Sequence, residues 1–236
     1  APAPDPGVSG VGARGYFIAG TDTGTGKTRV TCALLRSLNL AGRRATGMKP
    51  VATGAELVDG RFFSDDVARI AANSAHISPG SRINSYLFDS PVSPDIAAEL
   101  AGISIDPVAI LKDYETLASQ AEIVLVEGTG GWLCPMGPRQ TMADVAVLLG
   151  IPVILVVGLR LGCISHALLS AESIRGRGCT FSGWIGNRID PDYRLPDANV
   201  ATLTRLLGLP PLALLEYAPQ EVPLPGAEVL ARAHRL

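Results

Sequence analysis

The sequence is poor in the residues that hold metal ions or form disulfides. Only three histidines occur among 236 residues, and none has a partner at metal-ligand spacing, which argues against a zinc site. The four cysteines, Cys32, Cys134, Cys163 and Cys179, are widely spaced without a C-x-x-C pair, so we expect reduced thiols and no redox motif. No G-x-S-x-G motif appears, so a serine hydrolase has no support.

Strong charge and long apolar runs are also missing. A formal net charge of −2 argues against nucleic acid or an anionic membrane as the main partner. The longest apolar run, residues 151–157, contains a proline and is far too short to span a bilayer, so it predicts a buried strand. Residues 1–14 show no secretory signal, and we therefore expect a cytoplasmic protein.

Apolar residues are abundant in the sequence, and charged residues are few. The chain is 47% hydrophobic and 18% charged, which is typical of an α/β protein with a buried parallel sheet. Residues 1–15 are rich in Ala, Pro and Gly and predict a flexible tail, because such a segment buries too little surface to offset its ordering entropy. Residues 16–236 are predicted to form one domain.

A glycine-rich segment at residues 20–28 follows an apolar strand and opens onto a helix, which is the setting of a phosphate-binding loop. Gly24 and Gly26 allow backbone N–H groups to converge on an anion. Lys27 would reach the terminal phosphates, and the Thr28 hydroxyl would bind magnesium. The strict pattern fails by one position, since its first glycine stands one place early. The alternative is a glycine-rich turn with an incidental lysine.

Two ionisable residues close other predicted strands. Lys49 stands at the carboxyl end of the strand predicted over residues 44–51, at the edge where open α/β sheets bind ligands. Glu127 ends the apolar strand at residues 122–127 and is followed by glycines, an arrangement that brings a carboxylate near magnesium. A solvated lysine and a solvated glutamate are the simpler interpretations.

Three polar residues have two interpretations each. Asp65 and Asp66 begin a helix after Ser64, and both could only cap it, or one of them could bind magnesium. Asn187 follows the strand at residues 180–186 and could either read a base edge or serve as a turn residue. Spacing alone does not choose between these roles.

Strands and helices alternate along the whole chain after the tail. This alternation predicts a P-loop NTPase-like α/β fold with six or seven mostly parallel strands in a central sheet and helices on both faces. Further helices are predicted over residues 93–100, 105–118, 141–149, 197–207 and 227–234, and a last short strand over 211–215. The segment at 158–167 is predicted to lead into one more helix, which ends near residue 176.

In combination, these motifs resemble those of dethiobiotin synthetases. The resemblance rests on the loop at 20–28, Lys-Pro-Val-Ala-Thr-Gly at 49–54, Ser-Asp at 64–65, Val-Glu-Gly at 126–128, Gly-Gly-Trp at 130–132 and Gly-Cys-Ile-Ser-His-Ala at 162–167. It runs in order from about residue 16 to residue 217. It implies an enzyme of biotin synthesis that uses ATP, magnesium and carbon dioxide or bicarbonate to close a ureido ring on 7,8-diaminopelargonic acid.

The resemblance also implies roles for single residues. The residues that it implies for catalysis are Lys49, Lys27 and Thr23, and those for magnesium binding are Thr28, Asp65 and Glu127. For ATP binding it implies Thr23, Gly24, Gly26, Lys27, Thr28, Glu127 and Asn187. For substrate binding it implies Thr53, Lys49, Gly130 and Ser165. The family is homodimeric, with each diamine site completed by the other subunit. Ser165 and Arg160 stand where some members carry asparagine and lysine.

An ATP-driven switch of the partitioning or metal-cluster-delivery type is the alternative. Such proteins also carry a variant phosphate loop on a parallel sheet. They usually have an additional lysine near the start of the loop, and residues 20–25 contain none.

Overall fold

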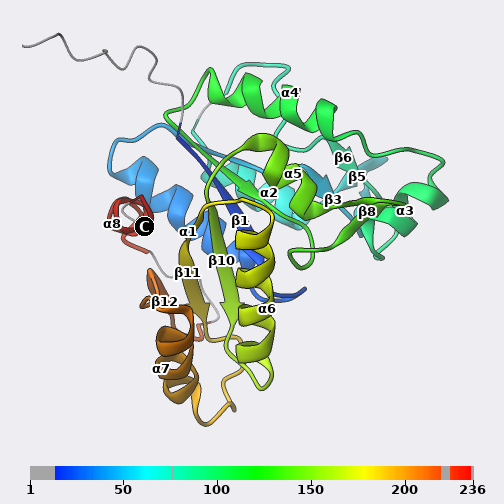
Figure 1. Cartoon of the computed structure of the whole chain (residues 1–236). Coiled ribbons are helices and arrows are strands. Elements are labelled where there is room, and N and C mark those ends of the chain that lie inside the picture. Colours follow the sequence, from blue (N-terminus) through cyan, green and yellow to red (C-terminus); the bar gives the residue numbers. More distant parts are fainter. Residues whose placement is uncertain (1–13, 76, 219–223, 235–236) are drawn as a thin grey trace, which may run out of the picture.

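A computed structural model describes residues 14–75, 77–218 and 224–234 of the chain (Figure 1). Most of the predicted tail, residues 1–13, lies outside these ranges. Its last two residues belong instead to the first strand, β1 (Arg14–Gly20).

The centre of the molecule is a six-stranded sheet in the order β12-β11-β10-β1-β7-β2. Every neighbouring pair in it is parallel, which confirms the predicted sheet. Its other strands are β2 (Ala45–Met48), β7 (Ile123–Glu127), β10 (Val153–Gly158), β11 (Phe181–Asn187) and β12 (Ala213–Leu215). Because β7 lies between β1 and β2, the first two strands of the chain are not neighbours.

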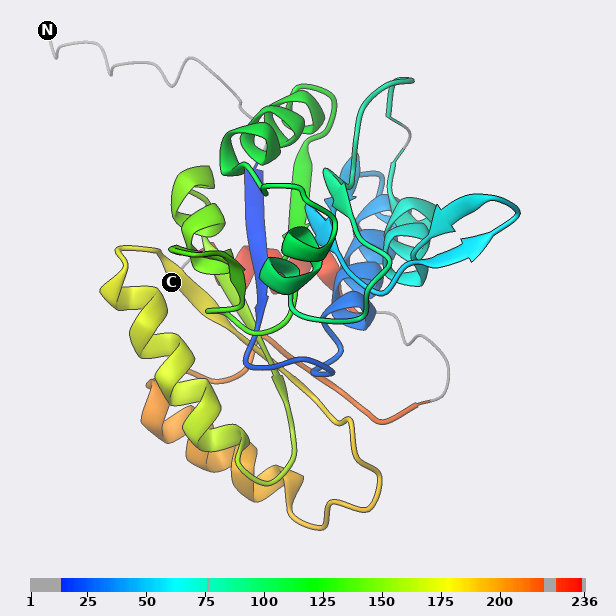
Figure 2. The ribbon, with the colours of Figure 1, turned by 90° about the vertical axis from the view of Figure 1, so that its right-hand side faces the viewer.

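Alternation along the strands divides the interior into two cores. In β1, Phe17 and Ala19 face one core, and Tyr16 and Ile18 face the other. The first core is covered by α4 (Pro107–Ala118), α5 (Met142–Leu149), α6 (Cys163–Gly176) and α7 (Pro196–Leu207); the second by α1 (Lys27–Leu40), α2 (Asp65–Asn73) and α8 (Gly226–Ala233). Figure 2 shows these helices on the two faces of the sheet, as the sequence predicted.

Three small two-stranded pairs were not predicted. They are β3 (Val51–Ala52) with β6 (Tyr86–Leu87), the hairpin β4 (Glu56–Val58) with β5 (Arg61–Phe63), and β8 (Pro135–Gly137) with β9 (Gln140–Thr141). Segments of two or three residues are too short for apolar periodicity to reveal them. The β8 strand packs against the short helix α3 (Pro94–Leu100).

The parallel sheet brings distant parts of the sequence to one edge. Gly20, Glu127 and Asn187 each end a strand, and Lys49 follows β2 directly. Since parallel strands end at the same edge, this edge collects the polar residues that the sequence analysis identified. Within the described ranges, no helix is long and apolar enough to cross a membrane. The four cysteines are free thiols.

Candidate active site

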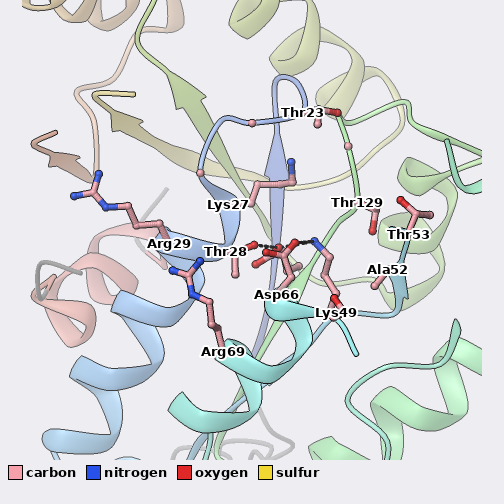
Figure 3. Close-up of a pocket in the computed structure, with 15 residues that line it drawn as sticks. Thr23, Lys27, Thr28, Arg29, Lys49, Ala52, Thr53, Asp66, Arg69 and Thr129 are labelled. Carbon is pink, nitrogen blue, oxygen red and sulfur yellow. Dashed lines mark hydrogen bonds and ion pairs between the residues drawn. The ribbon is translucent and has the colours of Figure 1, made fainter. Parts of the chain in front are cut away.

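A pocket of about 380 Å³ opens at the carboxyl edge of the sheet (Figure 3). It lies between the phosphate loop, the ends of β2 and β7, and the start of α2. Nine of the residues predicted from the sequence line it: Thr23, Gly24, Gly26, Lys27, Thr28, Lys49, Thr53, Glu127 and Gly130.

The phosphate loop is held by its own polar groups. Asp22 accepts a hydrogen bond at Oδ1 from the Thr23 N–H (2.7 Å), and its carbonyl accepts one from Lys27 Nζ (3.1 Å). Gly26 has φ of 82°, a left-handed conformation that favours glycine, and it turns the chain into the first residue of α1. The N-terminus of this helix therefore faces the pocket and favours an anion there.

Arg160 supports the same loop from outside. Its guanidinium forms an ion pair with the Asp22 carboxylate. The side chain that stands where some dethiobiotin synthetases carry lysine is thus engaged by the phosphate loop of its own chain.

Glu127 is the centre of the charged network in the pocket. Its side chain is 0% exposed, and Oε1 accepts hydrogen bonds from Lys49 Nζ (2.6 Å) and Thr28 Oγ1 (2.7 Å). Lys49 Nζ also lies 3.3 Å from Asp66 Oδ2. The second carboxylate oxygen of Glu127 is buried and has no hydrogen-bond partner.

The two lysines of the pocket have opposite electrostatic environments. Burial, assisted by the positive charge of Lys49, lowers the pKa of Lys27 to about 8. Burial also disfavours the charge of Lys49, but the carboxylates of Glu127 and Asp66 outweigh it and raise the pKa of Lys49. For Asp66, burial is likewise outweighed, by Lys49 and the Thr28 hydroxyl, and its pKa is lowered.

The donor set suits magnesium bound together with a nucleotide. Within the described part of the chain, no group of three or more His, Cys, Asp and Glu side chains could hold a metal alone. Magnesium, however, is usually bound by one or two carboxylates with water and substrate phosphates. The free Glu127 oxygen, the Thr28 hydroxyl and the Asp66 carboxylate supply such a set, so the residues present fit the ion.

The aspartate that reaches the pocket is Asp66, whereas the resemblance implied Asp65. The Asp65 side chain is 74% exposed and pairs with Arg69 at 3.6 Å, one helical turn further along α2. Asp66 lines the pocket beside Lys49. Consecutive helical residues point about 100° apart, and Asp66 is the one of the two whose side chain lines the pocket. The candidate magnesium ligand therefore changes from Asp65 to Asp66.

Two other predicted residues do not line the pocket. Asn187 is 1% exposed and lies behind the phosphate loop, where its amide Nδ2 donates to the Thr25 carbonyl (2.9 Å). Ser165 is exposed near the start of α6 and does not line this pocket.

Several residues that line the pocket were not predicted from the sequence. They include Arg29, Arg69 and Thr129. In Figure 3, Thr129 lies beside Thr53, and Arg29 lies at the opposite end of the pocket. Thr129 donates a hydrogen bond to the Val51 carbonyl, which ties the loop after β7 to β3. No motif contains the two arginines, and only their helical positions relative to the loop reveal them.

Replacing Lys27 with methionine is expected to stabilise the ligand-free protein. The pKa of Lys27 is about 8 in the folded protein, against 10.5 for an ordinary lysine side chain. Burying the charged form of Lys27 therefore costs on the order of 3 kcal/mol of folding free energy at pH 7. The unfolded chain holds this proton more tightly, so the cost is full below pH 8 and fades as the pH rises towards 10.5. Urea unfolding from pH 7 to pH 10, without nucleotide or divalent metal, measures the difference.

Lys112→Met is the control for this experiment, because Lys112 is exposed on α4. It is expected to show no comparable pH-dependent gain. A Lys27→Met protein less stable than the native one at pH 7 would contradict the assigned cost of burial.

Comparison with known proteins identifies the relatives of the chain. A family model described as an AAA domain matches residues 14–223. The ATP-dependent dethiobiotin synthetase BioD of Aromatoleum aromaticum is 50% identical over 205 residues, which cover 86% of this chain and 91% of that protein. The enzyme of the same name from Nitrosospira multiformis is 45% identical over 204 residues, covering 86% and 88%.

Solved structures show the same fold at much lower identity. The septum site-determining protein MinD of Pyrococcus horikoshii, complexed with Mg-ADP, has a TM-score of 0.56 at 20% identity and covers 94% of each chain. A ParA family ATPase from Chlorobium tepidum has a TM-score of 0.56 at 13% identity, covering 94% of this chain and 99% of its own. These structures support the P-loop fold alone. The relatives at 45–50% identity are decisive for the family, and the chain belongs to the ATP-dependent dethiobiotin synthetases.

Proposed function

We propose that this chain forms dethiobiotin from 7,8-diaminopelargonic acid, carbon dioxide and ATP. The observation that carries the proposal is a second buried lysine, Lys49, in the same pocket as the phosphate-loop lysine, Lys27. The additional lysine of an ATPase switch stands near the start of the phosphate loop, whereas Lys49 directly follows β2, where it can hold a second anion beside the triphosphate. Membership of the synthetase family supports the same conclusion.

The chemistry joins two anions and then closes a ring. One substrate amine takes up carbon dioxide, forms a carbamate and releases a proton. The carbamate oxygen attacks the terminal phosphorus of ATP, which gives a carbamic-phosphoric anhydride and ADP. The second amine then attacks the carbonyl carbon, the C–O bond to phosphate breaks, and the ureido ring closes with loss of inorganic phosphate and a proton.

The positive charges of the two lysines offset the electrostatic repulsion between the carbamate and the triphosphate. Lys27 is placed to hold the terminal phosphates, and Lys49 to hold the carbamate and the phosphoryl group in transfer. Cations fixed in a low-dielectric pocket stabilise developing charge without reorganising during the reaction. The Glu127 and Asp66 carboxylates keep Lys49 protonated and hence able to act in this way.

Magnesium would be held by Glu127, Thr28 and Asp66 together with phosphate oxygens. When bound with ATP, the magnesium ion would neutralise part of the negative charge of the phosphates. We place the substrate beside Thr23, Thr53 and Gly130, which line the pocket with Lys49. Gly24 and Gly26 contribute loop N–H groups to the triphosphate, and Asn187 also belongs to the ATP site. The reaction belongs in the cytoplasm, where ATP is present and free thiols such as these four persist.

An ATPase switch remains the second candidate only because of the fold. MinD and ParA proteins share the sheet, but at 13–20% identity they carry no information on activity. The direct test measures ATP cleavage and dethiobiotin formation with each substrate omitted in turn. Cleavage that requires both the diamine and dissolved carbon dioxide, with one dethiobiotin formed per ADP, is the expected result. Brisk cleavage without either substrate would favour the switch.

We also propose that the enzyme is a homodimer whose site is completed across the interface. Ser165, the substrate residue implied by the resemblance, is absent from the pocket of its own chain and exposed on α6. Two leucines that flank it in the sequence are also exposed, Leu161 by 88% and Leu169 by 66%. A second copy would cover them and bring its own Ser165 to this site.

Mixing two inactive variants tests the shared site. Lys49→Met removes a group from one chain, and a bulky Ser165→Trp would obstruct the site of the other. In a mixed dimer, one of the two sites contains neither change, so mixing is expected to restore up to about a quarter of native activity, because about half of the dimers are mixed. No recovery in a preparation that light scattering shows to be mixed dimers would contradict a shared site.

A further inference from the structure

The backbone that carries Lys49 lies between two sheets. Strand β2 ends at Met48, which pairs with Val126 of β7, and β3 begins at Val51 in a separate small sheet. The chain therefore leaves the central sheet at Lys49 and Pro50. Because the hydrogen bonds of the sheet have ended there, another part of the chain must bond the backbone that directs the Lys49 side chain into the pocket.

A segment that leads into β6 supplies most of these hydrogen bonds. The Lys49 N–H donates to the Ile83 carbonyl at 2.7 Å. The Pro50 carbonyl accepts from the N–H groups of Ser85 and Tyr86, at 3.0 and 2.9 Å. Since proline has no N–H, the remaining backbone group of this turn that needs a partner is the Lys49 carbonyl.

The side chain of Asn84 is the partner of that carbonyl. Its amide Nδ2 donates to the Lys49 carbonyl at 2.7 Å and to the Tyr86 carbonyl at 3.0 Å. An amide nitrogen carries two hydrogens, so this half-buried side chain can bond both carbonyls at once. Carbonyl oxygens can only accept, and they therefore also determine which way the amide group faces.

The segment around Asn84 is also bonded to helix α4, independently of Lys49. Ser85 Oγ donates to Asp113 Oδ2 at 2.7 Å, and Asp113 belongs to α4. The Ser78 N–H donates to Oε1 of Gln120, just beyond the end of α4, at 2.7 Å. Asn84 thus connects the Lys49 backbone to a segment held by a helix, and loss of its amide leaves that segment attached to α4.

Lys49 requires exact placement because its ammonium has close partners in the pocket. Its Nζ lies 2.6 Å from Glu127 Oε1 and 3.3 Å from Asp66 Oδ2, and the side chain is only 5% exposed (Figure 3). A misplacement of about 1 Å in a reacting geometry can cost about 10²-fold in rate. A change in the backbone at Lys49 is therefore expected to reach the chemistry.

We propose that Asn84 is a positioning residue for Lys49, whose amide holds the Lys49 carbonyl and thereby fixes the ammonium in the pocket. The inference rests on the proposed function, in which Lys49 holds the carbamate and the phosphoryl group in transfer. Asn84 does not line the pocket and acts through Lys49. It supports the transfer step, whereas the phosphate loop provides the binding of ATP.

Replacing Asn84 with alanine tests the proposal. At saturating substrates, Asn84→Ala is expected to lower the single-turnover rate of dethiobiotin formation about 10- to 100-fold. The dissociation constant of ATP should stay within about twofold of the native value, because the phosphate loop is unchanged. Asn84→Ser, whose shorter side chain does not span the same gap, is the milder second variant and has the same expected direction.

Ser85→Ala is the matched control. It removes the hydrogen bond to Asp113 from the same segment but leaves the Lys49 carbonyl bonded to Asn84. Its melting temperature is expected to fall by a similar amount, while its single-turnover rate stays within about twofold of native. Equal losses of rate in folded Ser85→Ala and Asn84→Ala would overturn the proposal, since Asn84 would then contribute only to stability.

A double-mutant cycle shows whether Asn84 acts through Lys49. In a Lys49→Met background, Asn84→Ala is expected to lower the residual rate by less than about threefold, because the ammonium that it positions is absent. Losses that multiply in the double variant would overturn the assignment to Lys49. A native rate in folded Asn84→Ala or Asn84→Ser would do the same.

Amide hydrogen exchange gives a readout that needs no product. In the ligand-free protein, Asn84→Ala is expected to speed exchange of the Lys49 N–H at least about tenfold, and Ser85→Ala by less than about threefold. Unchanged exchange in Asn84→Ala would contradict the support of the Lys49 backbone. Should the native protein form no dethiobiotin, the proposed function fails, but hydrogen exchange still decides whether Asn84 fixes this backbone.

Discussion

Lys49→Met is expected to lower the rate of dethiobiotin formation by at least about 10²–10³-fold while ATP still binds. Lys49 is the cation assigned to the carbamate, and its loss removes stabilisation that matters mainly during phosphoryl transfer. Lys27 and the phosphate loop remain to bind ATP. Single-turnover measurement of dethiobiotin, with ATP affinity measured in parallel, checks both parts. A folded Lys49→Met enzyme with native rate would remove Lys49 from the mechanism.

The variant leaves the Glu127 carboxylate buried without its cation. Such a loss can cost about 3–5 kcal/mol of stability. Lys49→Arg keeps a positive charge near Glu127 and provides a folded alternative. Since a planar guanidinium cannot replace a compact ammonium, this variant is also expected to bind ATP and to lose most of its rate. Lys112→Met, an exposed change, is expected to have no effect.

Replacing the two neighbouring aspartates one at a time is expected to give very different enzymes. Asp66→Asn should lower the rate by about 10²-fold at limiting magnesium and recover in part when magnesium is raised, because the amide is a weaker ligand for a hard cation. Asp65→Asn should stay within about twofold of native, because its side chain is 74% exposed and outside the pocket. Magnesium titration of activity and of ATP affinity measures both.

Each aspartate variant controls for the other. They remove the same carboxylate from adjacent positions in the first turn of α2, so effects on helix capping should be similar. A larger loss for Asp65→Asn than for Asp66→Asn would reverse the assignment and restore the ligand that the family resemblance implied. Asp66 is 44% exposed in the ligand-free protein, which leaves it accessible to magnesium arriving with ATP.

The parts of the site that the sequence predicted best are those formed by continuous segments. A phosphate loop consists of a strand, a glycine-rich turn and a helix in immediate succession, so local patterns specify it. Lys49 and Glu127 were predicted because each lies at the carboxyl end of an apolar strand, and all parallel strands of the sheet end at one edge. Once the strands were located, their convergence needed no knowledge of the strand order.

The sequence did not predict features that depend on rotation about an element or on contacts between distant segments. Asp65 and Asp66 differ only in the direction of their side chains on α2, which packing of the helix decides. Thr129 reaches the pocket because the loop after β7 lies against β3, and the register of that short strand has no periodic signal.

The sequence by itself indicated the family and the parallel α/β fold, and it predicted that Lys27, Lys49 and Glu127 share one pocket, because these features depend on local motifs and strand ends. Only the tertiary structure decided that Asp66 faces the pocket in place of Asp65, and that Asn187 lies buried between Arg29 and the phosphate loop. The physical reason is the same in both cases. The direction of a side chain is set by packing between segments that lie far apart in the chain, and no local pattern records it.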